Sequence, residues 1–128
     1  MIDVDHFKKI NDHYGHHIGD EALRWISRRL FAAVRQSDFI IRFGGEEFVL
    51  VFPGISLKDL SKRCEAIILG IRKLKLEFEG QSIPVTASIG AVTYPDQGNN
   101  YNDLLENADK RLYQAKETGK NKFVISQS

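Results

Sequence analysis

The chain has 128 residues, of which 42% are hydrophobic and 27% are charged, and its formal net charge is +1. This length predicts one domain that buries a core without disulfides, and the near-neutral charge argues against a nucleic-acid or membrane-surface binder. We find no apolar run of membrane-spanning length and expect no signal peptide, and the single cysteine, Cys64, favours a reducing cytoplasm.

Apolar residues recur at helical or alternating spacing, and glycine, proline or a capping residue marks most boundaries. Gly15 separates the first two helices, Ser56 is a predicted N-cap and Gly119 a predicted C-cap. The predicted elements, in chain order, are a strand end over 2–4, a helix over 5–14, a helix opened by 19–21 and continuing to 34, strands over 39–41 and 48–52, a helix over 57–74, extended runs over 76–78 and 83–94, a helix from 102 to 119 and a strand over 123–125.

The resulting order, roughly β-α-α-β-β-α-β-α-β, mixes strands and helices throughout. Such an order predicts an α/β fold, more closely an α+β sandwich in which helices flank a mainly antiparallel central sheet. We expect a single domain over residues 1–128, because repeats, linkers and low-complexity segments are absent from the sequence.

The most informative segment runs from Arg42 to Phe48 and reads Arg-Phe-Gly-Gly-Glu-Glu-Phe between two strand-like runs. A Gly-Gly pair in this position predicts a tight hairpin turn, because glycine reaches positive φ without a Cβ clash. Two carboxylates, Glu46 and Glu47, follow directly. A bare turn beside two acids lets a phosphate-bearing ligand and a hard cation approach the backbone, so the composition favours a site over a mere turn.

A second acidic cluster, Asp3-Val4-Asp5, stands at the strand end that precedes the first helix. Acids in such a place can hold a divalent cation against a phosphate. The structural alternative is that Asp5 caps the helix and Asp3 is a solvated strand-end acid. The four histidines are irregularly spaced and have no cysteine nearby, so surface or capping roles fit them better than a zinc site.

Two further groups combine charges at short spacing. Arg35 and Asp38 offer an arginine fork and a carboxylate that could bind a guanine edge and a phosphate, although a local ion pair would also explain them. Lys116 and Lys120 lie four residues apart at a helix end, where they could neutralise a triphosphate or form a solvated basic face.

In their order and spacing these segments resemble the GGDEF domain, the diguanylate cyclase catalytic domain of bacterial signalling. The resemblance covers nearly the whole chain and implies a fold related to class III nucleotide cyclases and polymerase palms. It also implies the condensation of two GTP into cyclic di-GMP and two pyrophosphates. The segments that carry it are Asp3 to Asp12, Gly15-His16, Gly19-Asp20, Arg42 to Phe48, Ala87 to Gly90, Ala108-Asp109, Leu112-Tyr113, Ala115-Lys116 and Gly119 to Asn121.

The resemblance implies roles by matched position. Asp3 and Glu46 would hold Mg²⁺ (or Mn²⁺) with the help of the Val4 carbonyl, and Glu47 would support metal binding or activate the attacking hydroxyl, so the catalytic residues are Glu46, Glu47 and Asp3. Arg35 and Asp38 match the RxxD site at which the product inhibits the enzyme. The substrate would be bound by Asn11 and Asp20 at the guanine edge, by backbone amides around His6 and Phe7, by the side chains of Lys8, Lys116 and Lys120, and by the turn Gly44-Gly45 beneath the α-phosphate.

This assignment agrees with elementary chemistry. Guanine N1 and N2 are donors and O6 is an acceptor, which suits an aspartate and an asparagine. Because each domain would bind one GTP, a product ring with two-fold symmetry requires a homodimer in which two domains face each other.

The sequence departs from the family pattern in three places. Glu46 stands where the family name has aspartate, although both are hard oxygen ligands, and Lys120 replaces a usual arginine, which keeps the charge but loses the bidentate fork. The helix and Asp-x-Leu-Thr turn that normally open the family are missing, which would expose apolar sheet surface. We therefore expect a fragment of a longer protein, membrane-attached or not, whose N-terminal sensory or regulatory domain controls dimerisation.

Two functions of different classes remain open. The first is an active, Mg-dependent diguanylate cyclase module. The second is a non-catalytic module that binds GTP or cyclic di-GMP, which a degenerate motif would favour, and the segment from Gly44 to Phe48 is not degenerate. An interaction-only fragment that is silent because it is truncated is a third reading.

Overall fold

The computed structural model describes residues 1–125, which form four helices and seven strands in two sheets. Within this range no helix is long and apolar enough to cross a membrane. The elements are β1 (Ile2–Val4), α1 (Phe7–Tyr14), α2 (His16–Ala33), β2 (Phe39–Arg42), β3 (Glu47–Val51), α3 (Leu57–Arg72), β4 (Leu76–Phe78), β5 (Gln81–Ile83), β6 (Ala87–Ala91), α4 (Tyr101–Glu117) and β7 (Phe123–Ile125).

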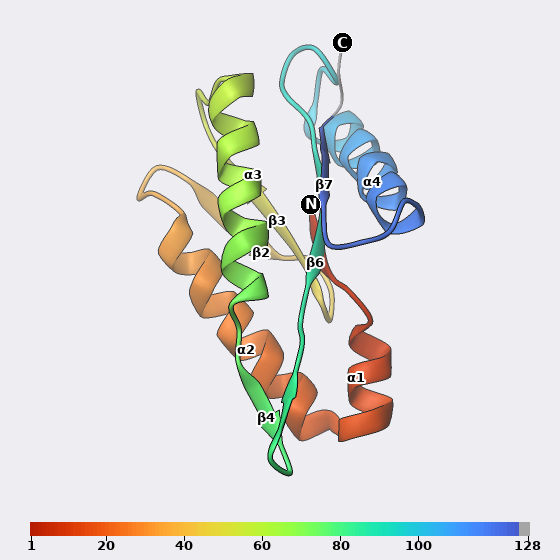
Figure 1. The fold of residues 1–128 in the computed structure, drawn as a ribbon. Helices are drawn as coiled ribbons and strands as arrows, with labels where there is room; N and C mark the ends of the chain where they lie inside the picture. The colour runs from red at the N-terminus through yellow and green to blue at the C-terminus, as the bar shows by residue number, and fades with distance from the viewer. Residues whose placement is uncertain (126–128) are drawn as a thin grey trace.

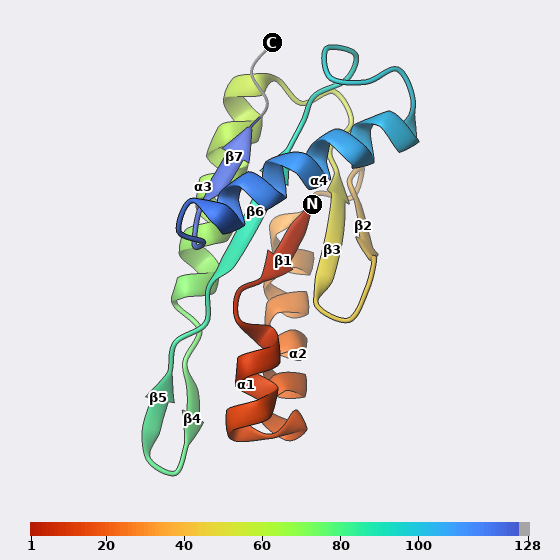
Figure 2. The ribbon, with the colours of Figure 1, turned by 90° about the vertical axis from the view of Figure 1, so that its right-hand side faces the viewer.

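The main sheet has the strand order β2-β3-β1-β6-β7, and its pairs are antiparallel except for the parallel pair β6–β7. Helices α2 and α3 lie on one face of this sheet and α4 lies on the other (Figure 1). The β4–β5 hairpin projects beyond the sheet at the end where α1 lies (Figure 2). The predicted fold class, helices flanking a mainly antiparallel sheet, is confirmed.

The core lies between the sheet and the helix pair α2 and α3. Leu23, Ile26 and Leu30 recur at a spacing of three and four along α2, and all are buried. Strand β1 contributes Ile2 and Val4, each 2% exposed, because alternate residues of a strand share one face. The residue between them, Asp3, therefore faces the opposite side of the sheet, which α4 covers.

Helix α4 approaches β6 at backbone distance. A Cβ built on Gly90 of β6 would lie 2.1 Å from the carbonyl oxygen of Ala108 and 2.2 Å from the amide nitrogen of Leu112. Only a glycine at this position lets the helix lie so close to the strand. The last turn of α4 is thereby held near the end of β1.

Most element boundaries differ from those predicted by one or two residues, and three differences have a clear physical reason. The extended run 83–94 is two strands in different sheets, because Pro84 cannot donate a ladder hydrogen bond and the chain leaves the β4–β5 hairpin there. Helix α2 begins at His16 rather than at 19, directly after Gly15 with its φ of 93°. Helix α4 begins at Tyr101 because the Asn100 side chain is its N-cap and accepts a hydrogen bond from the Asp103 amide.

The turn between β2 and β3 is not the tight positive-φ turn that the Gly-Gly pair predicts. Neither Gly44 nor Gly45 is among the described residues with positive φ. The turn is closed by the amides of Phe43 and Gly44, which both donate to the Glu47 carbonyl, and by the Arg42 guanidinium, which donates to the Gly45 carbonyl at 2.7 Å. The predicted hairpin is present, but it has a longer and more open turn.

Candidate active site

Strand pairing brings the two acidic clusters together. Strand β1 lies between β3 and β6, and Asp3 is paired with Glu47 on one side and with Ser88 on the other. The Val4 amide donates to the Glu46 carbonyl at 3.2 Å. Segments more than 40 residues apart in sequence therefore present Asp3, Glu46 and Glu47 at one place on the sheet.

Asp3 is not the solvated acid of the structural alternative, because only 20% of its side chain is exposed. The pKa of Asp3 is raised to about 6, mainly by burial; the charge of Lys116 opposes this rise, and the charges of Glu46 and Glu47 contribute to it. The Lys116 ammonium lies 3.8 Å from the Asp3 carboxylate. The cluster thus holds more negative charge than its one lysine neutralises, which is the condition in which a cation binds well.

Asp5 does not cap α1 either. The N-cap of α1 is His6, which makes no side-chain capping bond, and Asp5 is 2% exposed. Its carboxylate accepts four hydrogen bonds, from the hydroxyls of Thr86 and Ser88 at 2.7 Å each, the Lys116 ammonium at 2.8 Å and the Asn121 amide at 2.9 Å. Burial alone would raise the pKa of Asp5, but these hydrogen bonds hold it below its ordinary value.

The two lysines predicted to contact phosphates lie at the end of α4 and just beyond it. Lys116 is 21% exposed and bridges Asp5 and Asp3, so it does not belong to a solvated basic face. Lys120 follows the helix in a left-handed conformation, with φ of 61°, and is half-buried. Lys116 therefore stands on the side of the sheet that carries Asp3, and Lys120 follows in the turn directly after α4.

The residues predicted to read the guanine edge meet where α1 packs on α2. The Asn11 side-chain oxygen is buried and has no hydrogen-bond partner among the described residues. It lies against Gly19, since a Cβ built there would come within 1.8 Å of it, and the exposed Asp20 follows. A buried acceptor without a partner is costly, so this atom is well placed to accept from a ligand donor.

Neither contacts nor backbone conformation explains why the Gly44-Gly45 turn lacks side chains. A Cβ on Gly45 would have no neighbour within 4 Å, and on Gly44 it would make only ordinary contacts with Glu47. Neither packing nor positive φ requires glycine here. At the start of α1 nearby, the amides around His6 and Phe7 have no side-chain cap, and Lys8 is exposed. The two glycines therefore leave open space beside this turn.

Arg35 and Asp38 lie on the turn between α2 and β2. Their contact is a hydrogen bond from the Arg35 backbone amide to Asp38 at 2.8 Å, and the guanidinium that pairs with Asp38 is that of Arg63 on α3, at 3.0 Å. Burial would raise the pKa of Asp38, but these two donors lower it. Arg63 also lies over the Phe52 ring, 4.5 Å from its centroid. Sequence reasoning missed Arg63 because nothing local connects it to a residue 25 positions away.

Within residues 1–125 no three or more His, Cys, Asp or Glu side chains form a cage for a metal ion. The predicted magnesium ligands, Asp3, Glu46 and the Val4 carbonyl, are a smaller set of two carboxylates and one main-chain oxygen. Hard oxygen donors of this kind suit Mg²⁺, which keeps other positions for water and substrate phosphate.

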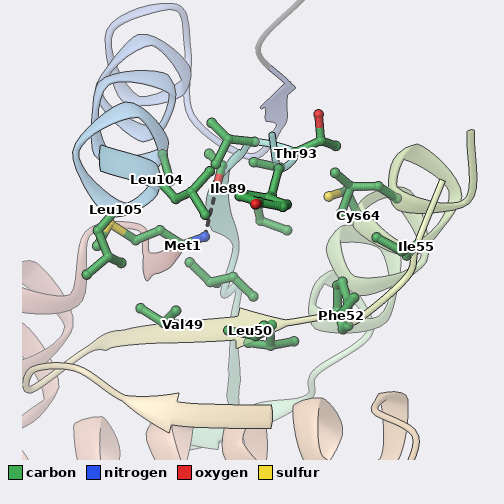
Figure 3. Close-up of a pocket in the computed structure, with 18 of the residues that line it drawn as sticks. Met1, Val49, Leu50, Phe52, Ile55, Cys64, Ile89, Thr93, Leu104 and Leu105 are labelled. Carbon is green, nitrogen blue, oxygen red and sulfur yellow. Dashed lines mark hydrogen bonds between the residues drawn. The ribbon is translucent and has the colours of Figure 1, made fainter. Parts of the chain in front are cut away.

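A separate apolar cavity of about 430 Å³ lies between β3, β6, α3 and α4. Val49 and Leu50 line one side and Leu104, Leu105 and Cys64 line others, while the Met1 amine donates to the Gly90 carbonyl at 2.8 Å (Figure 3). None of the predicted site residues lines this cavity. The polar site and the apolar cavity are therefore distinct parts of the fold.

Comparison with known proteins agrees with the geometry. The family model described as "Diguanylate cyclase, GGDEF domain" matches residues 1–122. The diguanylate cyclase DgcP of Pseudomonas aeruginosa is 38% identical over 127 residues, which are 98% of this chain and 19% of that protein. The chain therefore spans about a fifth of that relative.

Two solved structures are similar over nearly the whole chain. The GGDEF domain of DgcB from Caulobacter crescentus, in complex with c-di-GMP, has a TM-score of 0.91 at 28% identity, covering 99% of this chain and 75% of that one. The active GGEEF domain of a diguanylate cyclase from Vibrio cholerae has a TM-score of 0.88 at 28% identity, covering 99% and 81%.

Proposed function

Because the chain belongs to the GGDEF family of diguanylate cyclase domains, we propose that it is a catalytic module that condenses two GTP into cyclic di-GMP and two pyrophosphates. The observation that carries the proposal is the meeting of Asp3, Glu46 and Glu47 beside Lys116. Glu46 in the place of aspartate is compatible with turnover, since the domain from Vibrio cholerae is described as an active GGEEF domain.

The donor set fits a divalent cation: the pKa of Asp3 is raised mainly by burial, and the charges of Glu46 and Glu47, which such a cation would neutralise, add to the rise. We assign its binding to Asp3, Glu46 and the Val4 carbonyl. When bound, Mg²⁺ or Mn²⁺ would polarise the 3′-hydroxyl of one GTP and offset charge that grows on the α-phosphate of the other.

The remaining residues bind and orient the substrate. Asn11, whose side-chain oxygen is buried without a partner, would accept a hydrogen bond from guanine N1 or N2, and the neighbouring Asp20 would accept a second. Glu47 would assist metal binding or accept the proton of the attacking hydroxyl. The phosphates would be held by the amides around His6 and Phe7, by Lys8, Lys116 and Lys120, and by close approach to Gly44 and Gly45.

Catalysis would need two copies of the chain. Each copy offers one such site, and the two 3′-hydroxyls must each attack the α-phosphate bound by the other copy. The homodimer would form transiently, face to face, and in a longer parent protein an N-terminal regulatory domain would control its formation.

Chromatography of nucleotides after incubation of the purified chain with GTP and Mg²⁺ tests the proposal. We expect cyclic di-GMP from the parent and none from the Glu46→Ala, Glu47→Ala double variant. The variant Glu106→Ala, at an exposed acid on α4, is the matched control and should retain activity. If the parent, an N-terminally extended version and Glu106→Ala all remain silent under conditions where the chain is dimeric, the proposal fails.

Product binding at Arg35 and Asp38 is a separable proposal. Asp38 already accepts hydrogen bonds from the Arg63 guanidinium and from the Arg35 backbone amide. The exposed Arg35 guanidinium is therefore available to bind a phosphate or a guanine edge, which supports the proposal. Calorimetry with cyclic di-GMP should show an affinity loss of about tenfold or more for Arg35→Ala. Arg28→Ala, at another exposed arginine of α2, should bind as the parent does. Equal affinities for all three proteins would remove the assignment.

A further inference from the structure

Asp5 is a buried carboxylate for which the proposed chemistry has no role. It lies two residues from Asp3 on the same side of the chain, yet it is 2% exposed, whereas Asp3 is 20% exposed at its side chain. All four of its hydrogen bonds come from protein donors, two on each oxygen: Oδ1 accepts from Ser88 and Lys116, and Oδ2 from Thr86 and Asn121. A carboxylate saturated in this way has no lone pair left for a metal ion or a water molecule.

The donors come from two different parts of the chain. Thr86 and Ser88 belong to β6 and the residue before it, and they fix the carboxylate in place on the sheet. Lys116 and Asn121 lie 111 and 116 residues away in sequence, at the end of α4 and in the turn after it. Asp5 therefore joins the sheet to the segment that carries both phosphate-binding lysines.

A second set of hydrogen bonds holds the same turn. The Arg72 guanidinium, at the end of α3, donates to the Asn121 side-chain oxygen at 2.8 Å and to the Asn121 carbonyl at 3.2 Å. Asn121 and its neighbour Lys120 both have left-handed φ, 54° and 61°, a conformation that costs free energy in a non-glycine residue. The contacts from Arg72 and Asp5 offset that cost and keep the turn in one shape.

We infer that Asp5 is a positioning residue, which orients Lys116 and, through Asn121, Lys120 toward the polyphosphate of the substrate. This inference rests on the proposed GTP-binding function of the same site. The Lys116 ammonium spans Asp5 at 2.8 Å and Asp3 at 3.8 Å, so Asp5 sets how far this cation stands from the metal-binding acid. Without Asp5 the lysine would move to Asp3, where it would compete with the metal ion and leave the phosphates.

Binding of two matched probes separates positioning from general damage. The nucleotide 3′-deoxy-GTP cannot react, because it lacks the attacking hydroxyl, and 3′-deoxyguanosine differs from it only by the phosphates. Asp5→Asn should weaken 3′-deoxy-GTP binding by about tenfold or more while 3′-deoxyguanosine binding changes less than about twofold. The control Asp96→Asn, at an exposed loop acid, makes the same charge change and should leave both affinities unaltered.

A double-mutant cycle tests whether Asp5 acts through Lys116. If it does, adding Asp5→Asn to Lys116→Met should weaken 3′-deoxy-GTP binding by a clearly smaller factor than Asp5→Asn does in the parent. Equal factors in the two backgrounds, or equal losses for the nucleotide and the nucleoside, would overturn the inference. A parent that binds neither probe would overturn the proposed function together with it, whereas a parent that binds both and shows no effect of Asp5→Asn overturns the inference alone.

Arg72→Gln provides a second variant in case Asp5→Asn does not fold. Arg72 is exposed, so its replacement leaves the core intact while it releases Asn121 from one side. We expect a loss of about threefold in 3′-deoxy-GTP affinity, with 3′-deoxyguanosine unchanged. An affinity for 3′-deoxy-GTP equal to that of the parent would show that the turn needs no clamp and would count against the inference.

Discussion

Gly90→Ala is the substitution whose effect the structure defines most sharply. The new Cβ would lie 2.1 Å from the Ala108 carbonyl oxygen, about 1.3 Å short of the 3.4 Å at which ordinary contact begins. The three nearest atoms, on Ala108, Leu112 and Arg111, are all main-chain atoms of α4, which cannot rotate away as a side chain can. The helix must therefore retreat from β6 as a body.

The retreat has a cost that can be worked out approximately. A gap of 0.5–1 Å already forfeits roughly a quarter to a half of the dispersion energy across a packed surface, and α4 buries Ala108, Leu112 and Ala115 against the sheet. Overpacking usually costs about 1–3 kcal/mol, and a clash between backbones belongs at the upper end. A loss of about 3 kcal/mol would lower the melting temperature of a domain of this size by roughly 12 °C.

Gly70→Ala is the matched control, because Gly70 is also a buried glycine. There the three atoms nearest the added Cβ all belong to the Arg29 guanidinium, the closest at 2.8 Å, which is the far end of a flexible side chain. Alanine in a helix is favoured over glycine by about 1 kcal/mol, so Gly70→Ala should melt at or above the temperature of the parent. Calorimetric melting temperatures of the parent, Gly90→Ala and Gly70→Ala test this prediction. A Gly90→Ala variant that melts within about 3 °C of the parent would refute the close approach of α4 to β6.

Three further substitutions test separate parts of the molecule. Gly19→Ala puts a Cβ 1.8 Å from the Asn11 side-chain oxygen and should therefore weaken GTP binding by about tenfold or more. Competition with a fluorescent nucleotide measures this loss, and the melting temperature should change little. Asn100→Ala removes the acceptor for the Asp103 amide and should lower the free energy of unfolding by about 1 kcal/mol in a urea titration, whereas Asn100→Ser, which keeps the cap, should not. The pKa of Asp3 rises from 3.8 to about 6 on folding, so ionised Asp3 destabilises the folded state above pH 6, and this cost is absent below pH 4. Asp3→Asn should therefore stabilise the metal-free protein by about 1–3 kcal/mol at pH 7. A gain in stability that persists at pH 4 would contradict this cause.

The spacing of apolar residues, together with the glycine, proline and capping residues at element ends, is enough to predict most of the fold. The helices were predicted because apolar residues recur on one face, as in α2, and because Ser56 and Gly15 mark their ends. Alternation across Val85 and Ala87 predicts one strand over 83–94, and only the effect of Pro84 on pairing divides this run into two strands. The prediction for the turn at Gly44 is wrong because glycine predicts positive φ, whereas here the missing side chain leaves open space.

The candidate site could be predicted only in part, for a physical reason that the two acids of β1 make clear. Asp3 and Asp5 have the same side chain and stand on either side of Val4, and no local pattern tells which of them is buried. The difference arises from donors that the sequence places more than 80 residues later, on β6 and beyond α4. Likewise, the pairing of Asp38 with Arg63 depends on how α3 lies against the turn before β2.

These long-range donors couple the stability of the fold to the charge of the site. Helix α4, which lies against Gly90, carries Lys116 near its end, and the charge of Lys116 opposes the rise in the pKa of Asp3. A variant such as Gly90→Ala should therefore change more than the melting temperature. Well below its melting point it should bind 3′-deoxy-GTP less tightly than Gly70→Ala does, although Gly90 touches no residue that we assign to the substrate. Equal affinities would mean that the turn after α4 keeps its position through Asp5 and Arg72 even when the helix moves.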